Sequence, residues 1–241
     1  MMNMVYKTFK RFASETSGTT LTELAIVIPL LLLILMGAVE FGRLGYNIAM
    51  VQKATELAVR TAAVRPPICD GVPDTFEIGT SASAKAGSLC KAGAPGSICK
   101  IVITPPPCSL ANPGTTDSNK GRTTAEERSD AAQEIWDAIA PLLPNTTDLE
   151  NSITAANVFV RYEQDARIGF LSGPYTPVVT VEIGQLKNGD VERLDYKFIT
   201  PLGQLAGMAM LGGTSNIRSS FQFPTMSASM SGEDLANGPG S

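Results

Sequence analysis

An uncharged apolar run, Leu24 to Val39, constrains this chain more than any other feature. Extended back to Thr19, the run has 21 residues and is interrupted only by Glu23. As a helix it would be roughly 31 Å long at about 1.5 Å per residue, which matches the hydrocarbon core of a bilayer, about 30 Å thick. The run is therefore long enough to span a membrane. A cleavable secretory signal is the alternative, but its apolar core is normally only about 7 to 15 residues long.

The charges before the run predict its orientation. Residues 1–18 carry three cations, Lys7, Lys10 and Arg11, against one acid, Glu15. By the positive-inside rule this excess keeps the N-terminus in the cytoplasm. We therefore expect a single-pass protein of the inner (cytoplasmic) membrane, with everything after residue 40 in the periplasm or outside the cell.

The residues directly before the run form a second pattern, in which Gly18 is followed by the small residue Thr19 and then by Glu23. This pattern resembles the cleavage site of type IV prepilins, where a membrane peptidase cuts after the glycine. The resemblance implies that residues 1–18 are a cytoplasmic leader, that Thr19 becomes the new N-terminus, and that Glu23 becomes the fifth mature residue. The aromatic first residue usual in that family is absent.

The position of Glu23 in the apolar run can also be interpreted without the family resemblance. A carboxylate in a membrane helix costs on the order of 3 kcal/mol at the bilayer centre and less near the interface, so it usually has a partner. Cleavage after Gly18 would create an α-amino group four residues upstream, on the same helical face. The resemblance implies that Glu23 meets this group on a neighbouring subunit and sets the axial register. Snorkelling of Glu23 into the headgroups is the alternative.

The stretch "AVEFGRLGYNIAMVQKATELAVRTAAVR", residues 38–65, narrows the resemblance. It looks like the TadE-like family of minor pseudopilins, which typically carry an apolar helix, a Glu-Phe-Gly-Arg-like exit and an Ala-rich amphipathic continuation. The exit in this chain consists of Glu40, Phe41, Gly42 and Arg43. The resemblance covers residues 17–65 and predicts a transmembrane helix at 19–39 that continues as an amphipathic helix at 40–65.

The continuation is apolar on two sides. A helical projection gathers its polar residues into an arc of about 100°, formed by Gln52, Lys53, Glu56 and Arg60. One apolar side carries Leu44, Ile48, Val51, Ala58 and Ala62, and the other carries Tyr46, Met50, Leu57 and Val64. We expect the chain's own domain to cover one side and neighbouring helices the other. A helix buried wholly within one subunit is the alternative.

Two pairs of small residues lie at four-residue spacing near the exit, Ala38 with Gly42 and Gly45 with Ala49. Small residues at this spacing permit close approach of helices in membranes. The pairs therefore favour helix packing around the exit.

Pro66 and Pro67 end the helix, because proline lacks an amide donor and clashes with the preceding turn. Residues 66–226 then predict one extracytoplasmic α+β domain. Its expected helix, residues 124–140, begins with a capping box, either Thr123 with Glu126 or Thr124 with Glu127. Its expected strands are residues 98–104, 157–164, 176–186 and 216–223. The fold class is therefore α+β, with a long N-terminal helix packed on a domain that has an antiparallel sheet and at least one further helix.

Two segments of the outer domain carry weaker signals. Residues 198–211 are apolar, but they are too short for a second span and include Pro201 and two glycines. We expect them to pack against the sheet, while residues 196–213 have no assigned structure. Residues 227–241 are small and polar and are expected to form a disordered tail.

All four cysteines, Cys69, Cys90, Cys99 and Cys108, fall within 40 residues of the outer domain. An even number of cysteines in an oxidising compartment predicts two disulfides, with three possible connectivities. Free thiols are the alternative. The spacings match no zinc pattern, because zinc sites normally include a close pair of ligands.

Enzymatic functions find no support in the sequence. The chain has no histidine, which excludes histidine-based triads and histidine zinc sites. No phosphate-binding glycine loop is present, and the acidic residues Glu126, Asp130 and Glu134 have the spacing of a solvated helix face. With 19 basic and 23 acidic residues, the chain also lacks the charge of a nucleic-acid binder. We expect no enzyme activity, no cofactor and no metal.

The resemblance implies a minor pseudopilin that supports assembly of a Tad (tight adherence) or Flp type IV pilus, and hence adhesion and biofilm formation. The implied partners are a prepilin peptidase, the inner-membrane assembly platform, a companion pseudopilin and the pilin. The companion pseudopilin TadF is one alternative identity. A single-pass protein whose uncleaved anchor tethers a binding domain is another, and a secreted protein would require cleavage beyond residue 39.

Overall fold

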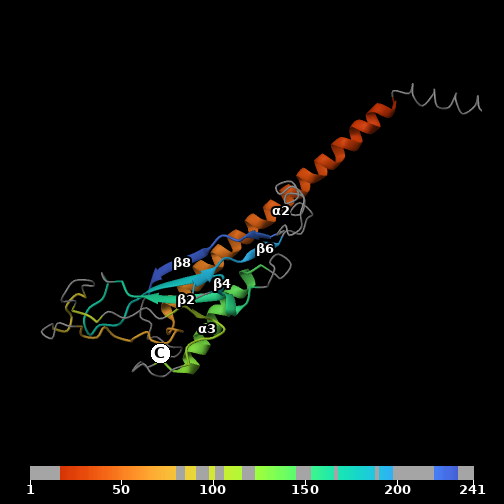
Figure 1. The fold of residues 1–241 in the computed structure, drawn as a ribbon. Helices are drawn as coiled ribbons and strands as arrows, with labels where there is room; N and C mark the ends of the chain where they lie inside the picture. Colours follow the sequence, from red (N-terminus) through yellow and green to blue (C-terminus); the bar gives the residue numbers. More distant parts are fainter. Residues whose placement is uncertain are drawn as a thin grey trace, which may run out of the picture. The chain divides into compact units, whose positions relative to one another are not determined.

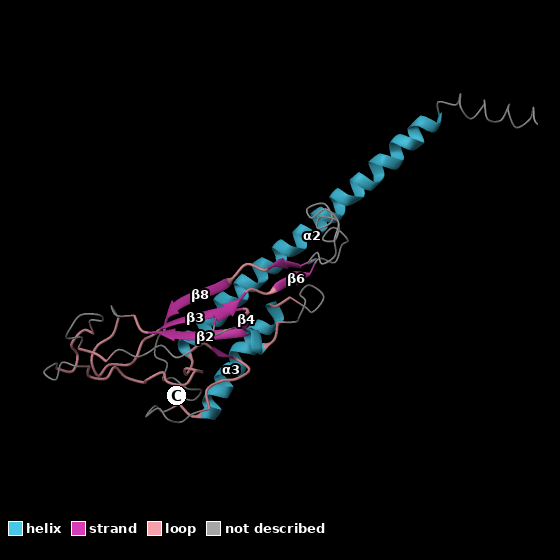
Figure 2. Ribbon diagram, in the orientation of Figure 1, coloured by secondary structure: helices cyan, strands magenta, loops and turns pink. Residues whose placement is uncertain are grey.

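The structure is a computed structural model of the 241-residue chain. It describes residues 17–79, 85–90, 98–100, 106–115, 123–144, 153–165, 168–187, 190–197 and 220–232. The chain divides into two compact units, Met1–Leu44 with Phe198–Ser219 and Gly45–Lys197 with Ser220–Ser241. Figure 1 follows the chain through its helices and strands, and Figure 2 distinguishes them by type. The described part of the first unit is helical, and that of the second is α+β.

Helix α2, Ser17–Val64, is the longest element at 48 residues. It joins the two predicted helical segments, 19–39 and 40–65, into one continuous helix, which ends one residue earlier than predicted. Pro29 lies inside it, and the helix stops just before Pro66. Among the described residues, α2 is the one helix long and apolar enough to cross a membrane. Its large side chains from Leu24 to Met36 are exposed, as a lipid-facing surface requires.

The part of α2 that belongs to the second unit has one buried side. Val51, Ala54, Ala58 and Ala62 are almost completely inaccessible to solvent. Thr55 is buried with them, and its hydroxyl donates a hydrogen bond to the Val51 carbonyl at 2.8 Å. This bond satisfies the hydroxyl inside the helix, so a polar residue is accommodated in an apolar core. This buried side agrees with one of the two apolar sides predicted from the sequence, the side that carries Val51, Ala58 and Ala62.

Helix α3, Ala125–Ile139, confirms the expected helix at 124–140. Thr124 is its N-cap, and the capping box is formed with Glu127. The Glu127 amide donates to the Thr124 hydroxyl, and the Thr124 amide donates to the Glu127 carboxylate. Ala131, Ala132, Ile135 and Ile139 form its buried side. A short 3-10 turn, η1 (Ala140–Leu142), follows the helix.

The main sheet has four antiparallel strands in the order β1-β2-β3-β8. Its strands are β1 (Cys108–Ser109), β2 (Val158–Glu163), β3 (Val178–Ile183) and β8 (Met226–Ser231), with the 3-10 turn η2 (Ala155–Asn157) leading into β2. In the central register, Val160 lies opposite Val181, and Val181 lies opposite Ala228. Val158, Val160, Val179 and Val181 are fully buried, so these two strands form the centre of the sheet's core.

Two small sheets complete the described strands. One pairs β4 (Gln185–Lys187) with β5 (Asp190–Glu192), and the other pairs β6 (Asp195–Lys197) with β7 (Ser220–Gln222). The predicted strand at 157–164 is confirmed by β2, and that at 216–223 is confirmed for its last residues. The strand predicted at 176–186 divides at Gly184 into β3 and β4, which belong to different sheets. Of the predicted strand at 98–104, Cys99 pairs with Ile78 in an isolated bridge, while residues 101–104 lie outside the described residues.

The predicted disordered tail is wrong where it overlaps β8. Residues 226–231 pair along the full length of β3, from Met226 opposite Ile183 to Ser231 opposite Val178. The backbone amides and carbonyls of β3 provide this pairing, and it does not depend on apolar side chains in β8. Residues 233–241 and the apolar segment 198–211 lie outside the described residues.

Two disulfides are present, as the even number of cysteines predicted. Cys69 is joined to Cys108, and Cys90 is joined to Cys99. The first links the segment after α2 to strand β1, and the second closes a short loop. All four cysteines are thus oxidised in the outer domain.

Candidate processing and assembly site

The predicted cleavage site lies at the very beginning of α2. Helix α2 starts at Ser17, so Gly18 and Thr19 belong to its first turn. Residues 1–16 of the predicted leader lie outside the described residues.

Glu23 lies one turn further along and is exposed. No hydrogen bond or ion pair to its carboxylate is recorded in the described part of the chain. It is surrounded in sequence by apolar residues, of which Leu24 is 53% exposed and Ile26 is 75% exposed. The carboxylate thus lies among exposed apolar side chains, and a carboxylate in a membrane helix usually has a partner.

The predicted exit motif divides between two sides of α2. Glu40 is buried at 2% exposure and Arg43 is half-buried, whereas Phe41 is 67% exposed. Gly42 and Gly45 are exposed, and a Cβ built on either would meet nothing within 4 Å. Ala38 is exposed as well. The motif therefore combines a buried carboxylate with a bare, small-residue surface on the opposite side.

The second apolar side predicted for α2 is largely uncovered. Tyr46 is 64% exposed, Leu57 is 38% exposed and Val64 is 48% exposed. Met50 is partly covered. The sequence predicted these residues to face neighbouring helices, and the structure leaves them accessible for such contact.

The end of α2 is joined to the outer domain by specific polar contacts. The Arg65 guanidinium forms an ion pair with Glu134 of α3. The Ile68 amide donates a hydrogen bond to the Tyr162 hydroxyl of β2 at 3.2 Å. Burial raises the pKa of Tyr162, and the bond from Ile68 acts in the opposite direction to a smaller extent. These contacts fix the direction in which the chain leaves the helix.

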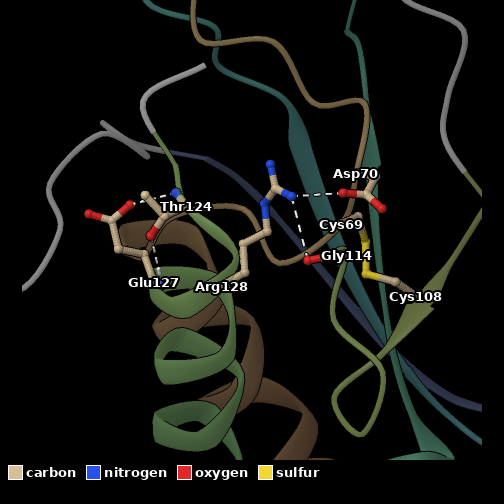
Figure 3. Close-up of polar contacts among 7 residues, drawn as sticks. All are labelled: Cys69, Asp70, Cys108, Gly114, Thr124, Glu127 and Arg128. Atoms are coloured by element: carbon tan, nitrogen blue, oxygen red, sulfur yellow. Dashed lines mark hydrogen bonds and ion pairs between the residues drawn. A yellow bond between two sulfur atoms is a disulfide. The ribbon is translucent and has the colours of Figure 1, made fainter. Parts of the chain in front are cut away.

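A partly buried ion pair joins α3 to the segment that follows α2, as Figure 3 shows. Nη1 of Arg128 donates to Oδ1 of Asp70 at 2.7 Å and lies 3.5 Å from the Gly114 carbonyl oxygen. The Arg128 side chain is 3% exposed and the Asp70 side chain 38%. Asp70 directly follows Cys69, whose disulfide to Cys108 fixes its position. Disulfide, ion pair and helix cap thus form one connected unit.

Gly114 lies next to the ion pair, where only a residue without a side chain fits. Its amide donates to the Ile68 carbonyl at 2.7 Å, and a Cβ at this position would overlap the Asp70 carboxylate. No sequence pattern predicts the pair of Arg128 and Asp70, because the two residues are 58 positions apart. The sequence did indicate the neighbouring acidic residues correctly, since Glu126, Asp130 and Glu134 are all exposed.

The described residues show no metal-binding cluster. They contain no cluster of three or more histidine, cysteine, aspartate or glutamate residues that is arranged to hold a metal ion. The described residues instead form a surface suited to binding: a long apolar helix that carries the Glu23 carboxylate and is joined to a disulfide-linked domain.

The fold and this site together define a class of protein with one N-terminal apolar helix, long enough to cross a membrane, that carries an α+β domain. The comparison with family models narrows the class. Residues 18–60 match the family described as TadE-like protein, so the N-terminal segment of this chain is TadE-like. The match begins at Gly18 and includes the whole exit motif. No curated protein and no solved structure matches the chain.

Proposed function

We propose that this protein is a TadE-like minor pseudopilin that supports assembly of a Tad/Flp type IV pilus through helix packing. The observation that carries the proposal is the family match over residues 18–60, which coincides with the helix that begins at Ser17. The match starts at the glycine after which a prepilin peptidase would cut. The protein is then a substrate of an enzyme and not an enzyme itself.

In this function the charged residues of the N-terminus hold the leader in the cytoplasm, and the peptidase removes residues 1–18. The outer domain lies on the far side of the inner membrane, where an oxidising environment agrees with its two disulfides. Partners are the peptidase, the assembly platform, a companion pseudopilin and the pilin. Adhesion and biofilm formation follow from the pilus that these proteins build.

The direct test is the N-terminal sequence and intact mass of the protein recovered from membranes, with and without reductant. We expect a chain that starts at Thr19 and has four cysteines protected from thiol labelling until it is reduced. A chain that starts at Met1 would favour an uncleaved anchor that tethers a binding domain. A start beyond residue 39 would show that the apolar run is a secretory signal.

Glu23 provides a second test. Glu23→Ala removes the register contact but leaves the apolar run intact, so membrane insertion is expected to be unchanged while piliation falls. Glu126→Ala is the matched control, because it removes an exposed carboxylate from α3. Wild-type piliation in the Glu23→Ala strain would contradict the role of Glu23 in assembly.

A further inference from the structure

One side of α2 is covered at the point where the predicted membrane span ends. We define the exit stripe as Gly37, Glu40 and Leu44, which follow one another at three- and four-residue spacing and therefore share one side of the helix. Glu40 is 2% exposed and Leu44 is 8% exposed, whereas the neighbouring Val39 and Phe41 are 70% and 67% exposed. Gly37 is partly covered. Another part of the chain therefore lies on the exit stripe.

The cover must suit a carboxylate as well as apolar groups. Burial of a carboxylate is costly unless polar groups satisfy it. Glu40 does have an interaction partner in the structure, and so has Arg43 one turn later. A segment of polypeptide provides both kinds of contact, because its side chains can be apolar while each of its residues except proline carries an amide donor.

The compact unit that holds the exit stripe contains one other segment of suitable position. This unit consists of Met1–Leu44 and Phe198–Ser219. Residues 1–16 join α2 at its far end, because the helix begins at Ser17. At about 1.5 Å per residue, that end is roughly 34 Å from Glu40. Phe198–Ser219 is therefore the segment of this unit that fits the cover of the exit stripe.

The sequence of this segment and its place between two strands support the assignment. Strands β6 and β7 pair with Lys197 opposite Ser220, so the chain leaves the outer domain and returns to it at one place. Residues 198–217 carry no charge. Burying a large apolar side chain is worth about 1.5 to 3 kcal/mol, so the segment favours an apolar contact surface. Its large apolar residues include Phe198, Leu202, Leu205, Met208 and Leu211.

We infer that the exit stripe of α2 is the docking site for residues 198–211 of the same chain, which cover the Glu40 carboxylate and attach the β6–β7 pair to the end of the membrane span. The outer domain is then held to its anchor at a second point, besides the direct continuation of α2. The sequence alone favoured packing of this segment against the sheet, and the test below separates the two contacts. The inference concerns contacts within one chain and goes beyond the proposed function.

Disulfide formation between engineered cysteines tests the contact in membranes. A disulfide forms only where the two Cα atoms come within about 7 Å and the side chains face each other. The native cysteines are already paired, so they do not interfere. After mild oxidation, we expect at least one double variant to lose both new thiols to maleimide labelling without forming a dimer. Leu44→Cys is combined in turn with Phe198→Cys, Leu202→Cys, Leu205→Cys, Met208→Cys and Leu211→Cys.

Gly42→Cys is the matched control for these pairs. Gly42 lies about 200° around the helix from Leu44 at 100° per residue, and it is exposed. A Cβ added there would meet nothing within 4 Å, so the substitution is accommodated. No pair that contains Gly42→Cys should form a disulfide within one chain.

Removal of the segment tests the cover independently. Residues 198–211 are replaced by a Gly-Ser linker of the same length, and a membrane-impermeant maleimide measures access to Leu44→Cys. We expect labelling to become about ten-fold faster, because a covered thiol reacts only when its cover opens. Gly42→Cys, which lies nearer to the apolar run, should label at the same rate with either segment. Retention of both native disulfides shows that the linker variant has folded.

Two results would overturn the inference: no disulfide in any Leu44→Cys pair, or unchanged labelling of Leu44→Cys in the linker variant. Either would leave the sheet or the membrane as the surface that residues 198–211 contact. The outcomes also separate the inference from the proposed function. If Thr19 does not become the N-terminus but the disulfide forms, the proposed function is wrong and the contact stands. If processing and piliation are normal and no disulfide forms, the contact is wrong and the proposed function stands.

Discussion

Replacing Asp70 by asparagine is expected to destabilise the outer domain, because it removes the carboxylate that pairs with the buried Arg128 guanidinium. Arg128 lies in the first turn of α3, where the helix dipole already disfavours a positive charge. Its guanidinium depends on Asp70 at 2.7 Å, with the Gly114 carbonyl at 3.5 Å as a weaker acceptor. The asparagine keeps the size and one oxygen but removes the charge.

The magnitude follows from the exposure of the two side chains. Breaking a fully buried ion pair costs about 3 to 5 kcal/mol. Here the Arg128 side chain is 3% exposed but the Asp70 side chain is 38% exposed, so solvent compensates part of the loss. We expect about 2 kcal/mol for Asp70→Asn, in the range for a hydrogen bond to a charged group. Arg128→Met should cost less, about 1 kcal/mol, because Asp70 can then be hydrated.

The chain provides its own probe for this measurement. Trp136 is the single tryptophan and lies on α3, two turns after Arg128. Urea unfolding of the full-length protein in detergent micelles, followed by Trp136 fluorescence, reports the stability of α3 in its native setting. With a slope of about 2 kcal/mol per molar urea, the expected loss shifts the midpoint by about 1 M.

A double-mutant cycle decides whether the ion pair causes the effect. Asp70→Asn introduced into the Arg128→Met protein should cost almost nothing, since the charge it would strand is gone. Asp130→Asn, the same chemical change at an exposed position of α3, is the control and should leave the midpoint unchanged. A midpoint shift below about 0.3 M for Asp70→Asn, or an equal shift in both backgrounds, would refute the reasoning.

Two further predictions concern the outer domain. Removing the Cys69–Cys108 disulfide, which spans 39 residues, should lower the free energy of unfolding by about 4 kcal/mol through loop entropy. Removing Cys90–Cys99, which spans 9 residues, should lower it by about 2.6 kcal/mol. Urea midpoints of the two double-alanine variants in the reverse order would contradict this ranking. Burial raises the pKa of Tyr175 to about 12, so the unfolded chain loses this proton first and stability should fall from about pH 10 to pH 12 by about 1.4 kcal/mol per pH unit. Tyr175→Phe should reduce this slope in Trp136-monitored unfolding, and an unchanged slope would exclude Tyr175 as its source.

Several elements were predictable because their signals are local. The length of the apolar run and the position of Pro66 predict where α2 runs and where it stops, and the helix indeed ends at Val64. The Thr124 capping box predicts the beginning of α3, since it depends on residues three positions apart. The β-branched and aromatic residues of β2 and β3 likewise predict strands, and in β3 the burial alternates with a period of two.

Other features became visible only in the tertiary structure. The sequence allowed three disulfide connectivities. The structure selects Cys69–Cys108, because the pairing of β1 with β2 places Cys108 beside the segment that holds Cys69. The division of the exit motif, with Glu40 buried and Phe41 exposed, depends on which side of α2 is covered. Local sequence carries no information about that choice.

The sequence alone determined a long N-terminal apolar helix, its embedded carboxylate, a capped second helix and two central strands, because each follows from residues close together in the chain. Only the tertiary structure decided that Met226–Ser231 form a strand, that Asp70 holds Arg128, and which side of α2 remains open. These depend on backbone and charge partners tens of residues away, which are brought together by folding and leave no periodic or adjacent pattern in the sequence.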